Sequence, residues 1–115
     1  MLFRSGEPAL DFLLNLLESS KPDERWWAIV ALSSMDEPRA QEATIMALGD
    51  GDETVRQCAA AGLRQHPNPE AVPNLVTALE GEDRLLARLA SGALAATGPE
   101  AIPALSEAKI GRAHV

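Results

Sequence analysis

Apolar and polar residues recur along this chain at helical spacing, and the pattern repeats at a fixed shift. Leu32, Leu63 and Leu94 are equally spaced along the chain. The same shift superposes other small or apolar residues, namely Trp27 with Cys58 and Leu89, and Ala28 with Ala59 and Ala90. Within each copy these residues fall on one face of an α-helix. A stripe repeated at this period predicts a solenoid, in which each unit buries its apolar face on its neighbours.

A second amphipathic segment follows each of these helices, after a proline-bearing corner at residues 36–38, 66–70 or 97–100. Proline lacks the amide donor and disfavours helix at the residue before it, so each corner ends one helix and begins another. The sequence therefore predicts an all-α fold, an α-α superhelix of antiparallel helix pairs with about three and a half 31-residue repeats. The expected pairs cover residues 23–48, 52–79 and 83–109, and a lone helix over 8–18 forms the N-terminal cap.

Two motifs of the middle unit resemble HEAT repeats. They are Asp52-x-x-Val55-Arg56-x-x-Ala59-Ala60-x-x-Leu63 and Pro69-Glu70-Ala71-Val72-Pro73-x-Leu75. The match is to the short HEAT-like repeats of the phycobilisome-lyase type, and it extends over roughly residues 8–108. The resemblance implies a helical-repeat scaffold of the armadillo-type class.

The resemblance also implies a ladder of ion pairs between units. In that family an arginine early in the first helix pairs with an aspartate of an adjacent unit. Arg25 and Arg56 stand at the matching positions, and the third unit has Ala87 there. The aspartates available as partners are Asp23, Asp52 and Asp83.

Composition narrows the class of partner. The chain has 115 residues, of which 46% are hydrophobic, with two Trp, two Phe and no Tyr. A core of Ala and Leu suits closely approaching helices, and the length suits one domain, expected over residues 1–109. The net charge of −7 disfavours nucleic acid, which requires a basic surface. No apolar run is long enough to span a membrane, so we expect no membrane partner.

The sequence offers few residues that could form a catalytic or metal-binding site. Cys58 is the only cysteine and falls on the apolar stripe, where we expect a small core residue. A catalytic triad or a zinc site cannot be assembled from Cys58 and the corner histidine, His66. We therefore expect no enzymatic activity, no cofactor and no metal. A single cysteine fits a reducing, cytoplasmic location.

The last residues, 110–115, break the repeat and read like translated sequencing-adaptor DNA. We expect this tail to be artefactual or disordered. A truncated array would expose the apolar face of its last repeat, which would favour self-association.

Two surfaces are expected to bind a partner. The first is the concave face made by the second helices, where the outward positions are mixed polar and mildly acidic and suit a basic or amphipathic peptide: Asp11, Asn15, Glu42, Met46 and Thr77. The second is an apolar patch on the first helix of the first unit. There Trp26 aligns with polar residues and should be exposed together with Ile29 and Val30, unless the N-terminal segment folds over them. Trp27 is expected in the core.

The expected function is a non-catalytic protein–protein interaction scaffold. The resemblance leaves open a phycobilin-lyase-like or chaperone-like subunit that handles a tetrapyrrole-bearing protein. A structural segment of a larger regulatory protein is a further alternative.

Overall fold

The computed structural model describes residues 7–101, and every regular element in that range is helical. The α-helices are α1 (Glu7–Leu16), α2 (Pro22–Leu32), α3 (Pro38–Met46), α4 (Glu53–Gln65), α5 (Val72–Leu79) and α6 (Arg84–Thr97). Short 3-10 helices follow or join them: η1 (Ala47–Gly49), η2 (Pro69–Ala71) and η3 (Gly98–Ala101). The all-α class predicted from the repeat is confirmed.

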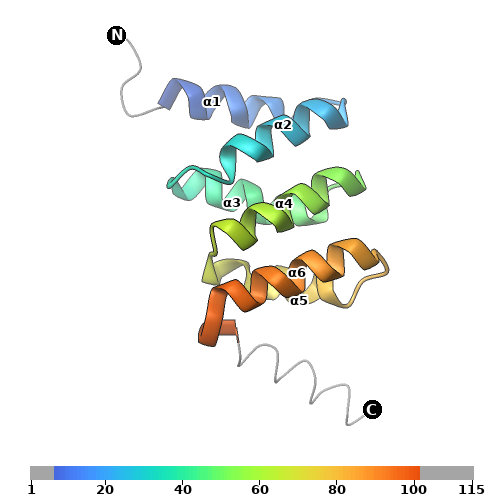
Figure 1. Cartoon of the computed structure of the whole chain (residues 1–115). Coiled ribbons are helices and arrows are strands. Elements are labelled where there is room, and N and C mark those ends of the chain that lie inside the picture. The colour runs from blue at the N-terminus through green and yellow to red at the C-terminus, as the bar shows by residue number, and fades with distance from the viewer. Residues whose placement is uncertain (1–6, 102–115) are drawn as a thin grey trace.

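The helices form two layers that follow the length of the stack (Figure 1). One layer consists of α2, α4 and α6, which we call the A helices; α4 lies between the other two and contacts both extensively. The other layer consists of α1, α3 and α5, the B helices. Each B helix packs on an A helix, α1 on α2, α3 on α2 and α4, and α5 on α6. The described residues thus form a stack of helix pairs in which α1 is the first B helix.

The C-terminal end of the predicted array lies largely outside the described residues. Of the pair expected over residues 83–109, residues 102–109 lie outside the described residues. The same holds for the tail at 110–115. The domain limits therefore stay predictions.

Aspartates at the turns begin two of the A helices. The Asp52 carboxylate accepts hydrogen bonds from the amides of Thr54 and Val55 at the start of α4. Asp83, the equivalent residue of the next repeat, accepts one from the amide of Leu86 at the start of α6. These amides have no partner within their own helix, so the carboxylates stabilise the helix ends.

The predicted apolar stripe forms the core. In α4 the side chains of Val55, Ala59 and Leu63 are buried, and so are their repeat equivalents in α6, Leu86, Ala90 and Leu94. Ala28, Ala59 and Ala90 are fully buried at the centre of the A layer. Small residues at these positions let neighbouring helices approach closely, which explains a core built with little aromatic volume.

The prediction that Trp27 lies in the core is wrong. Trp27 was expected in the core, yet its side chain is 62% exposed. Its repeat equivalent Cys58 faces the preceding A helix, with its thiol 3.9 Å from the carbonyl oxygen of Trp26. In the described residues no A helix precedes α2, so the Trp27 position has no neighbour to cover it.

Arg25 pairs with a different aspartate from those expected. Asp52 was an available partner, but its carboxylate caps α4, and Arg25 instead contacts Asp50 at 3.0 Å. The amide of Asp52 donates to Asp50 Oδ1 and holds that side chain in place. One repeat later Gly81 replaces the aspartate, and Arg56 pairs with Asp83 at 3.6 Å. The second step of the predicted ladder is confirmed and the first is shifted by two residues.

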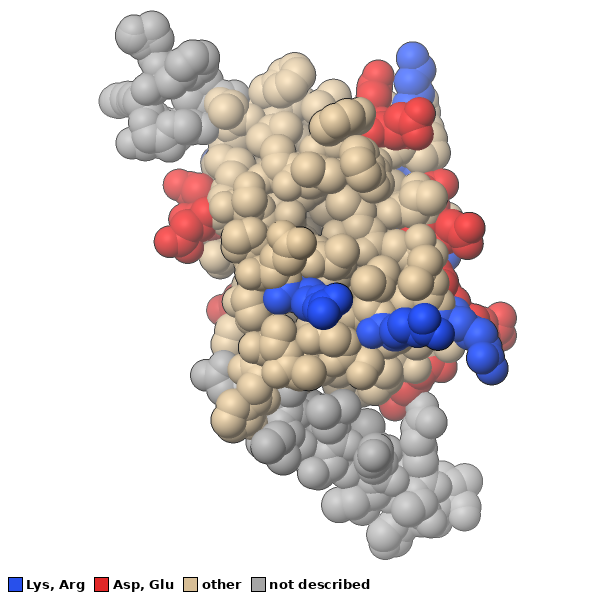
Figure 2. All heavy atoms as spheres, viewed as in Figure 1, with Lys and Arg blue, Asp and Glu red and all other residues tan. Residues whose placement is uncertain are grey.

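The face formed by the A helices carries its charges unevenly. In Figure 2 acidic side chains lie along the edges of this face, whereas its upper part, over α2, is mostly uncharged. The large apolar side chains exposed on the A helices are Trp26, Trp27, Val30 and Leu85. Figure 2 also shows basic side chains across the lower middle of this face, so the part with few charges is the one over α2.

Candidate functional site

The B helices bring together the residues expected on the outer face of the second layer. Asp11 and Asn15 lie on α1, and the repeat places their equivalents on α3 and α5. A separation of four residues keeps both members of each pair on one side of their helix. All of these positions are exposed, and we call them the B-face stripe: Asp11, Asn15, Glu42, Met46, Pro73 and Thr77.

Met46 is the apolar centre of the B-face stripe. Its side chain is 69% exposed, the largest exposed fraction among the large hydrophobic residues described. Thr77, on the next B helix, donates its hydroxyl to the carbonyl oxygen of Pro73 at 3.1 Å. A flexible thioether surrounded by polar groups can adapt to many apolar side chains of a ligand.

Charge on the B-face stripe is acidic and only partly neutralised. Asp11 forms an ion pair with Arg39 at 3.3 Å, and both side chains are mostly exposed. Exposed pairs contribute only about 0–1 kcal/mol, so a competing cation can displace Arg39. The carboxylate of Glu42 is also exposed. The stripe therefore offers one apolar contact flanked by acidic groups.

The second expected surface is the apolar patch on α2, which we call the A-face patch. The structure shows that its residues differ in part from those expected. Trp26 is 36% exposed and Val30 is exposed, as predicted. Ile29 was expected beside them, but its side chain is fully buried, so it cannot contact a partner. Trp27 takes its place, with its ring centroid 5.1 Å from that of Trp26 in an edge-to-face arrangement. The A-face patch is therefore Trp26, Trp27 and Val30.

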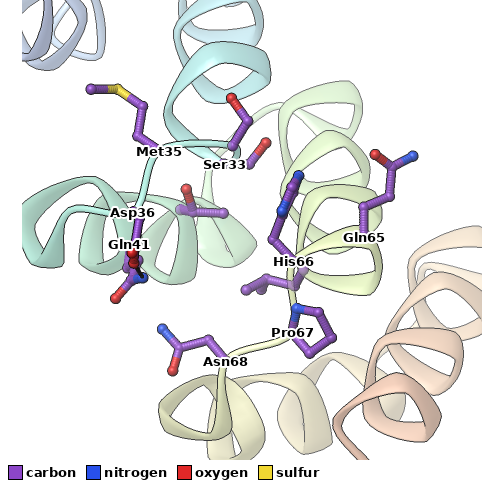
Figure 3. A pocket seen from close by; sticks show the side chains of 11 residues that line it. Ser33, Met35, Asp36, Gln41, Gln65, His66, Pro67 and Asn68 are labelled. Carbon is purple, nitrogen blue, oxygen red and sulfur yellow. Dashed lines mark hydrogen bonds between the residues drawn. The ribbon is translucent and has the colours of Figure 1, made fainter. Parts of the chain in front are cut away.

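Sequence reasoning missed a pocket at the corners between A and B helices. It encloses about 320 Å³ between the turn from α2 to α3 and the turn from α4 to η2 (Figure 3). Met35, Asp36 and Gln41 lie on one side, and His66, Pro67 and Asn68 lie on the other. The corner prolines signalled the turns, but nothing in the sequence signalled that the equivalent turns of two successive repeats form a pocket.

Reactive chemistry is sparse in the part of the chain that the structure describes. Among residues 7–101, no three His, Cys, Asp or Glu side chains are grouped so that they could hold a metal ion. Cys58 is half-buried, and burial raises the pKa of its thiol, which disfavours the reactive thiolate. None of the described helices combines the length and apolar character needed to cross a bilayer.

Comparison with known proteins agrees with the helical repeat. A family model described as HEAT repeats matches residues 42–109, which is more than half of the chain. The matched segment includes α4, α5 and α6 and the B-face stripe from Glu42 onward. No curated protein matches the chain.

Proposed function

Because the chain belongs to the HEAT-repeat family, we propose that it is a non-catalytic scaffold that binds a partner protein or peptide along the B-face stripe. HEAT repeats commonly serve as protein-interaction scaffolds. The observation that supports the B-face stripe is the alignment of exposed positions on three successive B helices, with Met46 at the centre.

The stripe favours a partner segment of particular chemistry. Met46 can receive one apolar side chain, and burying that contact supplies binding free energy. Asp11 and Glu42, on successive helices, attract Lys or Arg on either side of the apolar residue. The preferred ligand is therefore an amphipathic, basic segment, in keeping with the net charge of −7.

Site-specific photo-crosslinking tests this proposal. A photoreactive amino acid at position 46 should form a covalent adduct with a partner in the native cells, because that side chain lies within the stripe. The matched control is position 85, whose leucine is 49% exposed on α6, in the other layer. Equal adducts from both positions, or an adduct from position 85 alone, would exclude the B-face stripe as the principal site.

The A-face patch supports a second contact. Trp26, Trp27 and Val30 expose apolar surface in an area with few charges, and tryptophan is enriched among residues that dominate interface energies. A partner that spans the N-terminal end of the stack would contact both the patch and α1. Loss of binding on Trp27→Ser with retained binding on Leu85→Ser supports this contact.

An alternative function is suggested by the resemblance to repeats of the phycobilisome-lyase type. A tetrapyrrole-handling or chaperone-like subunit would bind a bilin, its acceptor protein, or both. Titration of the purified chain with a bilin, followed by absorbance, distinguishes this alternative: a saturable shift of the bilin spectrum supports it, and an unchanged spectrum excludes bilin binding. A structural segment of a larger regulatory protein would give neither a crosslinked partner nor a bilin shift.

The proposal extends to the domain limits, the location and the self-association of the scaffold. We propose that residues 1–109 act as one repeat domain in the cytoplasm, where a lone thiol stays reduced. Self-association through the last repeat is a further proposal. Size-exclusion chromatography over a range of concentrations tests it, and an elution volume that does not change with concentration would exclude it.

A further inference from the structure

Three arginines on the A layer have no acidic partner in the part of the chain that the structure describes. The chain has 17 acidic and 10 basic residues, so a basic side chain would be expected to find a carboxylate nearby. Other arginines, on α2, α3 and α4, do form ion pairs. Arg64, Arg84 and Arg88 are exposed, and within residues 7–101 their side chains form no ion pair or hydrogen bond. We call these three residues the arginine row.

The arginine row lies along one side of α6. Arg84, Arg88 and Gly92 follow one another at steps of four residues, which places them on the same side of the helix. Arg64 comes from α4 and reaches α6, because a Cβ atom at Gly92 would lie 3.3 Å from Arg64 Cδ and 3.5 Å from Arg64 Nε. Glycine at position 92 thus gives the Arg64 side chain room to lie against α6. Figure 2 shows basic side chains gathered across the lower middle of this face, over α4 and α6.

The helical repeat does not require these cations. The residues one repeat earlier are a serine, a glutamate and a glutamine: Ser33, Glu53 and Gln57. Arg64 lies in the last turn of α4, where the helix dipole favours a cation. Arg84, by contrast, is the first residue of α6, where the dipole disfavours one, and it repels Arg88 as a like charge four residues away. The two arginines of α6 therefore weaken the helix that carries them, which favours a role in binding.

The spacing of the row indicates the shape of a ligand. Four residues of an α-helix rise about 6 Å, so positions 84, 88 and 92 span about 12 Å. An extended peptide places alternate side chains on one side at intervals of about 6.6 Å. Acidic side chains at alternate positions of an extended segment therefore match the three cations, and a guanidinium group can bind each carboxylate with two hydrogen bonds.

The surroundings of the row favour a short acidic segment over nucleic acid. Acidic side chains lie along the edges of this face in Figure 2, and Glu82 and Asp83 immediately precede Arg84. A DNA or RNA strand is charged at every nucleotide, so it would extend past the row into these carboxylates. A peptide can carry its negative charges over the row alone.

We propose that the arginine row binds an acidic segment of a partner protein, extended along α6, with carboxylates at alternate positions paired to Arg84, Arg88 and Arg64. This segment has the opposite charge from the basic segment proposed for the B-face stripe, and it binds the other layer of helices. Charge complementarity of this kind contributes to specificity and to the rate of association. The arginine row is thus a site separate from the B-face stripe.

The test uses a capped pentapeptide with glutamate at its first, third and fifth positions and glycine between them. It is titrated into the full ¹⁵N-labelled chain at low ionic strength, and two-dimensional NMR follows the Nε–H groups of the three arginines and the backbone amide of Gly92. We expect saturable shifts at these groups, and weaker binding as salt is added, because salt screens exposed charges. The same peptide with glutamine in place of glutamate should give no comparable shift.

Two arginine variants with the same change of charge supply a matched comparison. Arg88→Gln introduces the residue that α4 carries at the equivalent position, so it should fold, and it should weaken peptide binding at least about threefold. Arg39→Gln makes the same change at an exposed position of α3, in the B layer, and should leave the affinity unchanged. If Arg88→Gln does not fold, Arg84→Glu decides: it introduces the glutamate of the preceding repeat, reverses one charge of the row and should weaken binding at least as much.

Several results would overturn the proposal. They are absence of saturable shifts at the arginine groups, equal shifts with the glutamine peptide, and equal affinity in wild type and Arg88→Gln (or Arg84→Glu, where that variant decides). An equal loss in Arg39→Gln would also overturn it, and tighter binding of a thymidine octanucleotide than of the acidic peptide would assign the row to nucleic acid instead. Because the acidic B-face stripe does not attract this probe, failure here leaves the crosslinking test at position 46 independent.

Discussion

Arg25 donates from Nε and Nη2 to the two carboxylate oxygens of Asp50, each at 3.0 Å. Arg25 lies on α2 and Asp50 in the turn before α4, so the pair joins consecutive repeats. Arg25 also donates from Nη1 to the carbonyl oxygen of Ser19, in the turn before α2, at 2.8 Å. Arg56 makes the equivalent contact in the next repeat, with Nη1 at 2.8 Å from the carbonyl oxygen of Asp50. These arginines fix the spacing of successive turns.

The first prediction concerns the coupling between Arg25 and Asp50. Arg25→Ala and Asp50→Ala should each lower the free energy of unfolding, and the double variant should lose less than the two losses added together. The reason is that the pair is bidentate and its side chains are largely shielded from solvent, which makes it stronger than an exposed pair. Urea unfolding of the four proteins measures the coupling.

The exposed pair Asp11–Arg39 provides the control, since it has one contact and little shielding. Its coupling should fall within the range of about 0–1 kcal/mol found for surface pairs. If the coupling between Asp11 and Arg39 were as large as that between Arg25 and Asp50, the bidentate geometry would add nothing to the coupling free energy.

Acid should weaken the fold through the turn aspartates. Partial burial opposes ionisation of Asp50, but the hydrogen bonds from Arg25 and from the Asp52 amide outweigh it, so the pKa of Asp50 lies below its ordinary value of 3.8. The pKa of Asp52 is lowered by the Thr54 hydroxyl and nearby amides, and that of Asp83 by the Leu86 amide, Gln57 and Arg56. Each folded-state pKa is thus below the unfolded value.

The unfolded chain therefore takes up protons first as the pH falls. The stabilisation is fully present above the ordinary pKa of 3.8 and is lost as the pH falls through that value toward the lower folded-state pKa values. Urea unfolding at pH 7, 5, 4 and 3 measures this loss. Asp50→Asn should show a shallower decline below pH 4, and an unchanged decline would assign the acid sensitivity to other groups.

Gly62 should not tolerate a methyl group. A Cβ atom at this position would lie 2.5 Å from Ser33 Cβ and 2.8 Å from Ser33 Oγ, on the neighbouring repeat. Alanine gains about 0.8–1.0 kcal/mol in helix propensity, while overpacking costs about 1–3 kcal/mol. Gly62→Ala should therefore lower the free energy of unfolding, by on the order of 1 kcal/mol.

Two variants check the cause. At Gly51 a Cβ atom meets nothing within 4 Å, so Gly51→Ala should be neutral within about 0.5 kcal/mol. Adding Ser33→Gly to Gly62→Ala removes the clashing atoms and should recover part of the loss. Greater stability of Gly62→Ala than of wild type would mean that α2 and α4 are not in close contact there.

The two tryptophans should differ in their access to solvent. Trp27 is 62% exposed and Trp26 is 36% exposed. Trp26→Phe, which keeps Trp27, should emit at longer wavelength and be quenched more by acrylamide than Trp27→Phe, which keeps Trp26. Equal, weak quenching in both variants would show that another segment covers the A-face patch.

The repeat made the helices predictable, and their ends less so. The sequence predicts the first pair over residues 23–48, and within it α2 ends at Leu32, well before the proline of the corner at residues 36–38. The hydroxyls of Ser33 and Ser34 donate to the carbonyl oxygens of Val30 and Ala31, and such local bonds compete with helix continuation. The apolar stripe carries no information about this competition.

The errors at Trp27 and Ile29 have different origins. For Trp27, alignment treats all repeats as equivalent, whereas within residues 7–101 no A helix precedes α2. Ile29 aligns with Ala60, and both are fully buried, so the alignment itself signalled burial at this position. The adjacent tryptophan suggested an exposed patch instead. The corner pocket lay beyond sequence reasoning, because it depends on how two turns approach each other in space.

The most direct test of the B-face stripe is the affinity of its crosslinked partner for two variants with the same new charge. Met46→Asp places a carboxylate at the apolar centre of the stripe, and Leu85→Asp places one on an A helix. Isothermal titration calorimetry should show binding at least about tenfold weaker for Met46→Asp, corresponding to about 1.4 kcal/mol, and unchanged for Leu85→Asp. Wild-type affinity in Met46→Asp, or an equal loss in both variants, would contradict recognition through this surface.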